Sequence, residues 1–255
     1  MKRSIVLTTI LCYISMLTYG QNPATGKFSY EKEVFQDGKS THVLIEDLFY
    51  NGSESMYVIY GDKHPADTTL SSDENGRVVL EINVNETEDL IYYMNFNTNE
   101  LLSTELYSNG QRCYVKDIVP KLKWTLVDEK KQIGPYKCQK ATTTFRCATY
   151  EAWFTTDIPL PIGPWKISGL PGLIVSLINK RVNVTYKLLS ARYPLVESNS
   201  LISAPVPPKG KYVLFKDFAS REKKEQEKMM VFLRAKVNGD QKDIGFIRPE
   251  CYDEK

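Results

Sequence analysis

Alternating hydrophobic and polar residues predict β-strands along most of the chain. Phe28, Tyr30 and Val34 alternate with charged or polar residues, which is the two-residue period of a strand with one exposed face. Similar segments follow at residues 42–50, 55–60, 77–84, 90–96, 101–107, 111–115, 122–127, 136–145 and 149–155. Short polar turns separate them, some marked by Asn-Gly pairs. The pattern predicts a mainly β fold, an antiparallel meander curled into a half-barrel or open barrel.

One helix is expected near the C-terminus, at residues 218–237. Residues 221–228 are almost entirely charged, whereas Met229 and Phe232 begin an apolar stripe at helical spacing, and Asn238-Gly239 supplies a stop signal. We expect the apolar half to pack on the sheet and the charged half to face solvent. A helix that binds a partner is the alternative.

Residues 1–20 have the form of a signal peptide, with a basic start and an apolar stretch followed by small residues before Gln21. We expect cleavage after Gly20 and an exported protein in the periplasm, on the cell surface or in the medium. No later segment is apolar over the length of a membrane span. The rest divides into a β domain, residues 21–198, and a proline-rich connection with a helical appendage, residues 199–255.

Charge argues against some partners. The chain has 33 basic and 31 acidic residues, and two of the basic ones, Lys2 and Arg3, belong to the predicted signal peptide. The processed chain would therefore be neutral, which gives no electrostatic footprint for nucleic acid or an anionic membrane.

Four cysteines follow the signal peptide: Cys113, Cys138, Cys147 and Cys251. In an oxidising compartment an even number predicts disulfides, with three possible connectivities, although buried free thiols are the alternative. Cys138 lies in the middle of a predicted strand and is expected to be buried. The two histidines, His42 and His64, lie far upstream, so no metal site is expected, and no cofactor either.

The least regular part of the apolar sequence is GPWKISGLPGLI at residues 163–174. Gly169 and Gly172 allow positive φ or close backbone approach, and the prolines remove backbone donors. A β-branched apolar run at residues 173–178 follows, so the segment is expected to form a kinked entry into a buried strand. In this interpretation Leu170, Leu173 and Ile174 supply core or cavity wall. The alternative is a loop that contacts a ligand at the rim of a cavity.

Gly169-Leu170-Pro171-Gly172-Leu173-Ile174 resembles the hexapeptide of the GLPGLI family of exported bacterial proteins. Four further blocks match in order: IGPYKCQKA at residues 133–141, AWFT at 152–155, IPL at 158–160 and GPWK at 163–166. The resemblance implies an exported protein of a family without an established activity. Cys147 stands where a turn glycine is expected, which suggests an extra bridge or a strained turn. Asn179 stands where an aspartate is expected.

A nucleophilic enzyme is poorly supported, because there is no G-x-S-x-G elbow and few histidines are available. Paired carboxylates remain a possibility, since several acids on or near strands could face a cavity: Glu31, Glu33, Glu46, Asp47, Glu81, Glu151 and Asp157. Each is expected to face solvent, because unpaired carboxylates are seldom buried. No residue is therefore assigned as catalytic.

Tryptophans in the matched region are candidates either for a ligand platform or for core. Pro159 and Pro161 keep the intervening residues out of a central strand and predict an apolar flap over one end of the sheet. The candidate contact residues are Trp153, Gly163, Pro164, Trp165, Gly169, Leu170, Pro171, Gly172, Leu173 and Ile174. We favour a non-catalytic binding or carrier module for an apolar or peptidic ligand, or for an envelope protein partner. The alternatives are an envelope hydrolase that uses cavity carboxylates, and a structural component of a surface assembly.

Overall fold

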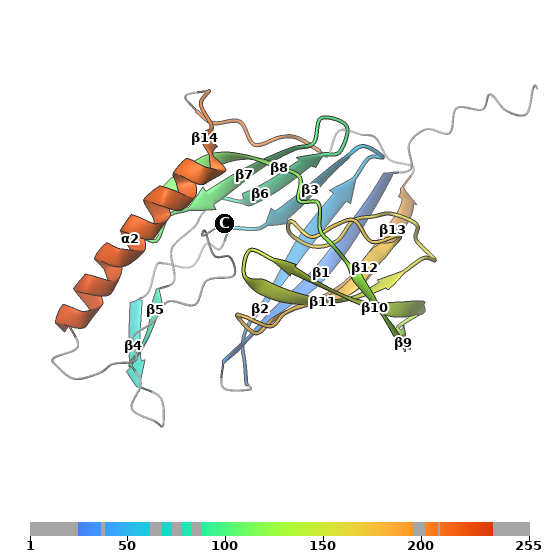
Figure 1. The fold of residues 1–255 in the computed structure, drawn as a ribbon, viewed down its shortest axis with the longest axis horizontal. Helices are drawn as coiled ribbons and strands as arrows, with labels where there is room; N and C mark the ends of the chain where they lie inside the picture. The colour runs from blue at the N-terminus through green and yellow to red at the C-terminus, as the bar shows by residue number, and fades with distance from the viewer. Residues whose placement is uncertain are drawn as a thin grey trace, which may run out of the picture.

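A strongly curved 12-stranded sheet is the main element of the computed structural model, which describes residues 25–36, 39–61, 68–72, 78–82, 88–195, 202–208 and 210–236 (Figure 1). Its strands are β1 (Thr25–Gln36), β2 (Lys39–Tyr50), β3 (Glu54–Ile59), β6 (Leu90–Asn95), β7 (Glu100–Leu106), β8 (Arg112–Ile118), β9 (Thr125–Ile133), β10 (Tyr136–Phe145), β11 (Ala148–Thr155), β12 (Leu173–Asn179), β13 (Val184–Leu195) and β14 (Val213–Leu214). A separate two-stranded sheet pairs β4 (Thr68–Ser72) with β5 (Val78–Ile82), and the helix is α2 (Phe215–Lys236).

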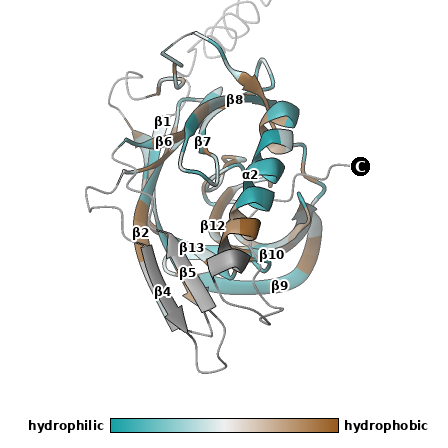
Figure 2. Cartoon of the chain, turned by 90° about the vertical axis from the view of Figure 1, so that its left-hand side faces the viewer, coloured by the Kyte–Doolittle hydropathy of each residue, from teal (hydrophilic) through white to brown (hydrophobic). Residues whose placement is uncertain are grey.

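The strand order is β14-β8-β7-β6-β3-β2-β1-β13-β12-β11-β10-β9, so the sheet ends at β14 and β9 and does not close. All neighbours are antiparallel except β14 and β8, which run parallel. Figure 2 shows how far the strands curl around a common interior. The fold is therefore the open half-barrel with one C-terminal helix that the sequence predicts.

Alternation in β1 explains which face of the sheet is inside. Phe28 and Tyr30 are fully buried, whereas Ser29 and Glu31 between and after them are partly exposed. Phe28 lies opposite Leu48 of β2, which is also fully buried. Directly opposed residues share a face of an antiparallel pair, so these side chains define the concave, apolar face.

A two-residue turn joins β10 to β11 at Arg146 and Cys147, which have φ values of 46° and 60°. Two successive positive φ angles belong to a type I′ hairpin turn, where Asn-Gly is the usual pair. The strained turn suggested by Cys147 is confirmed.

Helix α2 packs on the β14–β8 edge of the sheet through its first turns. Phe218 lies with its ring centroid 5.1 Å from that of Tyr107, and both are buried. Figure 2 shows a largely hydrophilic helix. Among the described residues, no helix has the length and apolar character that crossing a membrane would require. The predicted signal peptide lies outside the described residues.

Some element boundaries differ from the sequence-based expectation. β9 extends to Ile133 rather than ending at Val127, and β4, β13 and β14 were not predicted. The helix begins three residues earlier, at Phe215. The second half of β9 is charged and exposed, so its pairing with β10 holds it as a strand rather than an apolar pattern of its own. β13 does alternate, with Val184 and Tyr186 buried, and it pairs with β1 and β12.

Candidate functional site

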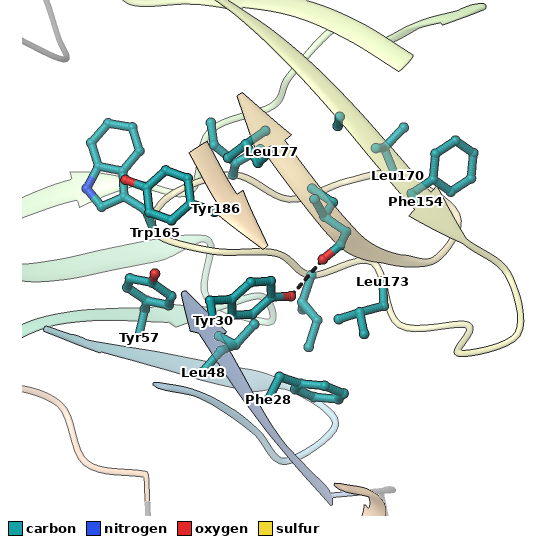
Figure 3. Packing of buried hydrophobic residues seen from close by; sticks show 14 of the residues in the cluster. Phe28, Tyr30, Leu48, Tyr57, Phe154, Trp165, Leu170, Leu173, Leu177 and Tyr186 are labelled. Atoms are coloured by element: carbon teal, nitrogen blue, oxygen red, sulfur yellow. Dashed lines mark hydrogen bonds between the residues drawn. The ribbon is translucent and has the colours of Figure 1, made fainter. Parts of the chain in front are cut away.

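The motif segment, residues 156–172 between β11 and β12, lies across the concave face instead of forming a flap over one end of the sheet. Ile162, Ile167 and Leu170 are at most 1% exposed. Figure 3 shows side chains from this segment and from β12 meeting side chains of β1 and β2 in one interior. The segment is therefore part of the core that holds the curved sheet together.

Trp165 joins two distant parts of the sheet. Its ring centroid lies 6.3 Å from that of Tyr92 on β6, and 6.3 and 6.5 Å from those of Phe145 on β10 and Tyr150 on β11. β6 and β10 are separated by six other strands in the sheet order. Trp165 also has a φ of 58°, a conformation that costs a bulky residue about 1–3 kcal/mol. The surrounding packing must hold it there.

The glycines of the motif act through the backbone. Gly169 has a φ of 94°, and a Cβ on Gly172 would lie 2.7 Å from the Thr155 carbonyl carbon and closer still to its oxygen. Leu173 and Ile174 are fully buried, as predicted. The Ile174 carbonyl at the end of the motif has a hydrogen-bond partner, because the Tyr30 hydroxyl donates to it at 2.7 Å (Figure 3). The kinked entry into a buried strand is confirmed.

Lys166, next to Trp165, is a buried cation on the concave side. Its Nζ lies 3.0 Å from Oε1 of Glu105 on β7, and only 2% of its side chain is exposed. The same atom lies 4.8 Å from the Trp165 ring centroid and 5.3 Å from that of Tyr92. Ser103 donates a second hydrogen bond to the Glu105 carboxylate. These contacts hold Trp165 and Lys166 against Tyr92 of β6 and Glu105 of β7.

Other buried acids are also neutralised. Glu46 is fully buried, accepts a hydrogen bond from Tyr57 and pairs with Lys32 at 3.1 Å. Asp117 pairs with Arg146, whose guanidinium also lies 3.5 Å from the Phe215 ring centroid. The expectation that Glu46 and Asp47 face solvent was wrong, because each has a cation that the fold brings to it from β1.

The remaining acids considered for catalysis are separate from one another. Glu31, Glu33 and Glu151 are partly exposed, and Asp157 is exposed. Glu81 has a side chain outside the described set. Glu151 binds Lys140 and Lys180, and these lysines contribute to holding its pKa below the ordinary value although burial opposes them. A carboxyl that stays ionised is a poor general acid.

Asp47 gives the chain a predicted pH dependence. Burial tends to raise its pKa, but hydrogen bonds from Lys27, Ser29 and Tyr60, with the Lys27 charge, lower it below the ordinary value. A lowered folded-state pKa stabilises the protein above about pH 4 and loses that effect as the pH falls through the folded value. Asp47→Asn should therefore lower the free energy of unfolding by about 1.5–3 kcal/mol at pH 7.

The difference in unfolding free energy between the two proteins should be smaller at pH 2 than at pH 7, because a lower pH protonates more of the wild-type Asp47 carboxylate and removes the charge that asparagine lacks. Urea midpoints of both proteins at pH 7 and pH 2 check this, with the exposed Asp128→Asn as the control that should stay near wild type. An equal difference at both pH values would contradict the assignment.

Trp153 lies on the opposite face of β11 from Ala152, away from the concave core. It packs with Cys138 and Val175, and Lys131 Nζ lies 3.9 Å from its ring centroid. It is 7% exposed. Trp153 and Trp165 are both candidate contact residues in the sequence. In the structure they lie on different sides of the sheet.

Two of the cysteines are free thiols, Cys113 and Cys138. The expectation that they form disulfides was wrong, because they belong to separate apolar clusters. Cys138 is buried as predicted, and burial is the main cause that raises the pKa of both thiols to about 11. Cys147 is not among the free thiols, and Cys251 lies outside the described residues, so the expectation of at least one disulfide among the four cysteines stays a prediction.

An open cavity of about 360 Å³ lies where β9 and β10 form the edge of the sheet. We call it the edge cavity, and its lining residues are Lys130, Lys131, Gln132, Lys137, Cys138, Gln139, Phe154 and Thr156. Sequence reasoning missed it. The β9–β10 register shifts beside it, between Gln139 and Ala141, and the run of lysines was the available sequence signal. No group of three or more His, Cys, Asp or Glu side chains in the described part of the chain could hold a metal ion.

Comparison with known proteins places this geometry in a family. Residues 54–190 match the family described as N-glycanase peptide, N-terminal domain, and this range is more than half of the chain. The chain belongs to this family. The range matched to the N-glycanase N-terminal domain begins at β3 and ends within β13, so it includes the motif segment and the edge cavity. No curated protein sequence matches the chain. The resemblance to the GLPGLI family stays a prediction.

One solved structure supports the fold, and two others are similar at lower scores. PNGF-II in a P21 crystal form is 16% identical and has a TM-score of 0.50, covering 79% of this chain and 34% of PNGF-II. The same protein in a C2 form gives a TM-score of 0.45, with 69% and 28% covered. A DUF1329 family protein from Desulfovibrio piger ATCC 29098 is 7% identical, with a TM-score of 0.29 and coverage of 72% and 91%. The chain spans about a third of PNGF-II.

Proposed function

We propose that this chain is an exported, non-catalytic binding module and that the edge cavity is its ligand site. The observation that carries the proposal is the cavity itself. Its volume of about 360 Å³ lies within the range of roughly 300–1,000 Å³ that is usual for ligand pockets. It combines an apolar wall with several polar groups, as such pockets do.

The ion pairs of the buried and partly buried acids support a role without catalysis. On the concave side Glu46, Glu105 and Asp117 are each held in an ion pair. Glycoside-cleaving enzymes use two carboxyl groups facing one bond, one of them protonated. In this proposal the motif segment, with Trp165, Gly169 and Gly172, keeps the half-barrel in shape, and the ligand binds beyond it. An apolar ligand inside the curved sheet would need the motif segment to move.

The family name gives the proposal a context. The family is described as an N-glycanase N-terminal domain, and the likeness to PNGF-II covers 34% of that protein. We propose that the shared fold serves binding, with a saccharide or peptide ligand, rather than bond cleavage.

Two measurements test the proposal. In the first, the protein is incubated with a denatured N-glycoprotein, and mass spectrometry should find no released glycan; release would make the chain an enzyme and overturn the proposal. In the second, native mass spectrometry follows incubation with the low-molecular-weight fraction of an envelope extract. The wild type and Thr149→Trp should retain a bound species, whereas Thr156→Trp, which fills the edge cavity, should not. Equal retention by all three proteins, or by none, would overturn the site.

A further inference from the structure

The edge cavity offers both free cations and free hydrogen-bond acceptors, and we propose that it binds a sugar carrying a carboxylate. The inference rests on the proposed function, since it names the ligand class for the same cavity. Carboxylate and hydroxyl groups together match what the lining residues present.

Three lysines supply the positive charge. Lys130, Lys131 and Lys137 line the cavity and are exposed, and within the described residues no carboxylate lies at salt-bridge distance from any of them. This contrasts with Lys140 on the same hairpin, which pairs with both Glu129 and Glu151. None of the three cavity lysines therefore forms an ion pair with a described acid, although Lys131 lies over the Trp153 ring.

One acid borders this wall. The Asp157 carboxylate accepts the backbone N–H of Lys137 at 3.4 Å. It offsets one of the three positive charges and leaves an excess of two. An anionic group is therefore favoured in the cavity.

Register places the polar groups around one apolar side chain. Lys130 lies opposite Gln139, and Gln139 lies opposite Phe154 on β11. Directly opposed residues share a face, so one lysine, one amide and one aromatic ring line up across three strands. Phe154 belongs to the concave core, whereas Cys138 packs with Trp153 on the other face, so the cavity lies at the edge where the two faces meet. Phe154 is 2% exposed, so it closes the apolar floor of the cavity, and the exposed lysines and amides around it are the groups that meet a ligand.

The amide side chains decide between a sugar and a simple anion. Gln132 donates through Nε2 to the Gly134 carbonyl at 3.0 Å, and Gln139 donates in the same way to Val127 at 3.3 Å. Their Oε1 atoms are thereby left as acceptors. Sulfate offers only acceptors to these atoms and inorganic phosphate at neutral pH offers one or two O–H donors, whereas a sugar carries several hydroxyls that can donate to them. A ligand with both a carboxylate and hydroxyls satisfies the lysines and the amides together.

Calorimetric titration with tetragalacturonate tests this inference, and its fully methyl-esterified form serves as a neutral control with the same ring hydroxyls. We expect tetragalacturonate to bind at least tenfold more tightly than the ester, with weaker binding at 300 mM than at 50 mM NaCl. The double variant Lys130→Gln/Lys137→Gln should bind at least tenfold more weakly than wild type. Lys121→Gln, an exposed lysine outside the cavity, should bind like wild type. Denaturation midpoints confirm that the variants are folded.

Other results would overturn the inference. They are equal binding of the ester, wild-type affinity in the double variant, displacement by an equal concentration of inorganic phosphate, and tighter binding of a glutamate-rich peptide. If tetragalacturonate does not bind but native mass spectrometry still detects a species sensitive to Thr156→Trp, the acidic-sugar inference fails and the proposed function stands. If tetragalacturonate does not bind and native mass spectrometry detects no species sensitive to Thr156→Trp, both the acidic-sugar inference and the proposed function fail.

Discussion

Gly172→Ala is expected to lower the free energy of unfolding by about 3 kcal/mol or more. The added Cβ would lie 2.7 Å from the Thr155 carbonyl carbon and 3.1 Å from the Thr156 nitrogen, and both are backbone atoms. Backbone cannot rotate out of the way as a side chain can, so β11 and β12 would have to separate. Overpacking costs about 1–3 kcal/mol and occasionally more. Since a domain has a margin of roughly 5–15 kcal/mol, the loss should be easy to measure.

The urea midpoint of Gly172→Ala checks this, and Gly134→Ala is the matched control. Gly134 has a φ of 54° and nothing within 4 Å of its virtual Cβ, so alanine there meets only the left-handed backbone penalty of about 1–2 kcal/mol. Gly172→Ala should be clearly less stable than Gly134→Ala. If Gly172→Ala keeps the wild-type midpoint but loses a ligand, the motif is a recognition loop instead of a packing device.

Lys166→Met should cost about 3–5 kcal/mol of stability. Methionine nearly matches the lysine stem in length but leaves the Glu105 carboxylate without its cation, and breaking a buried ion pair from one side costs roughly that amount. Removing both charges should recover part of the loss, so the double variant Lys166→Met/Glu105→Gln is expected to be more stable than Lys166→Met alone. Chemical denaturation of the single and double variants measures this coupling.

The surface pair of Lys187 with Glu33 provides the control for this experiment. Half of the Lys187 side chain is exposed, and such pairs contribute about 0–1 kcal/mol. Lys187→Met should therefore remain close to wild type. A Lys166→Met variant no less stable than Lys187→Met would mean that Glu105 finds other partners when Lys166 is gone.

Much of the sheet is predictable from sequence, because alternation such as that of Phe28 and Tyr30 reports directly on one buried face. β9 beyond Val127 is different. Its residues are charged and exposed, and they form a strand only because β10 offers a partner. Glu46 and Asp47 show the same limit. Their neighbours Lys32 and Lys27 come from β1, and sequence alone does not reveal that pairing.

At the candidate site, the glycine and leucine roles in the motif follow from backbone chemistry and are predicted correctly. The position of Trp165 is not, because its contacts with Tyr92 and Tyr150 depend on how far the whole sheet curls. The edge cavity is also a product of assembly. Its lining comes from β9, β10, β11 and the residues just after β11, and the run of lysines signals charge there but not a hollow.

The bridge made by Trp165 also bears on how the chain folds. Tyr92 and Trp165 are far apart in sequence, and contacts of this kind form slowly because a long loop must close first. The apolar concave face of the sheet stays uncovered on both sides of β1 until the motif segment packs against it. A chain cut between β8 and β9 would therefore give two pieces with exposed aromatic faces, the kind of surface through which partly folded chains aggregate.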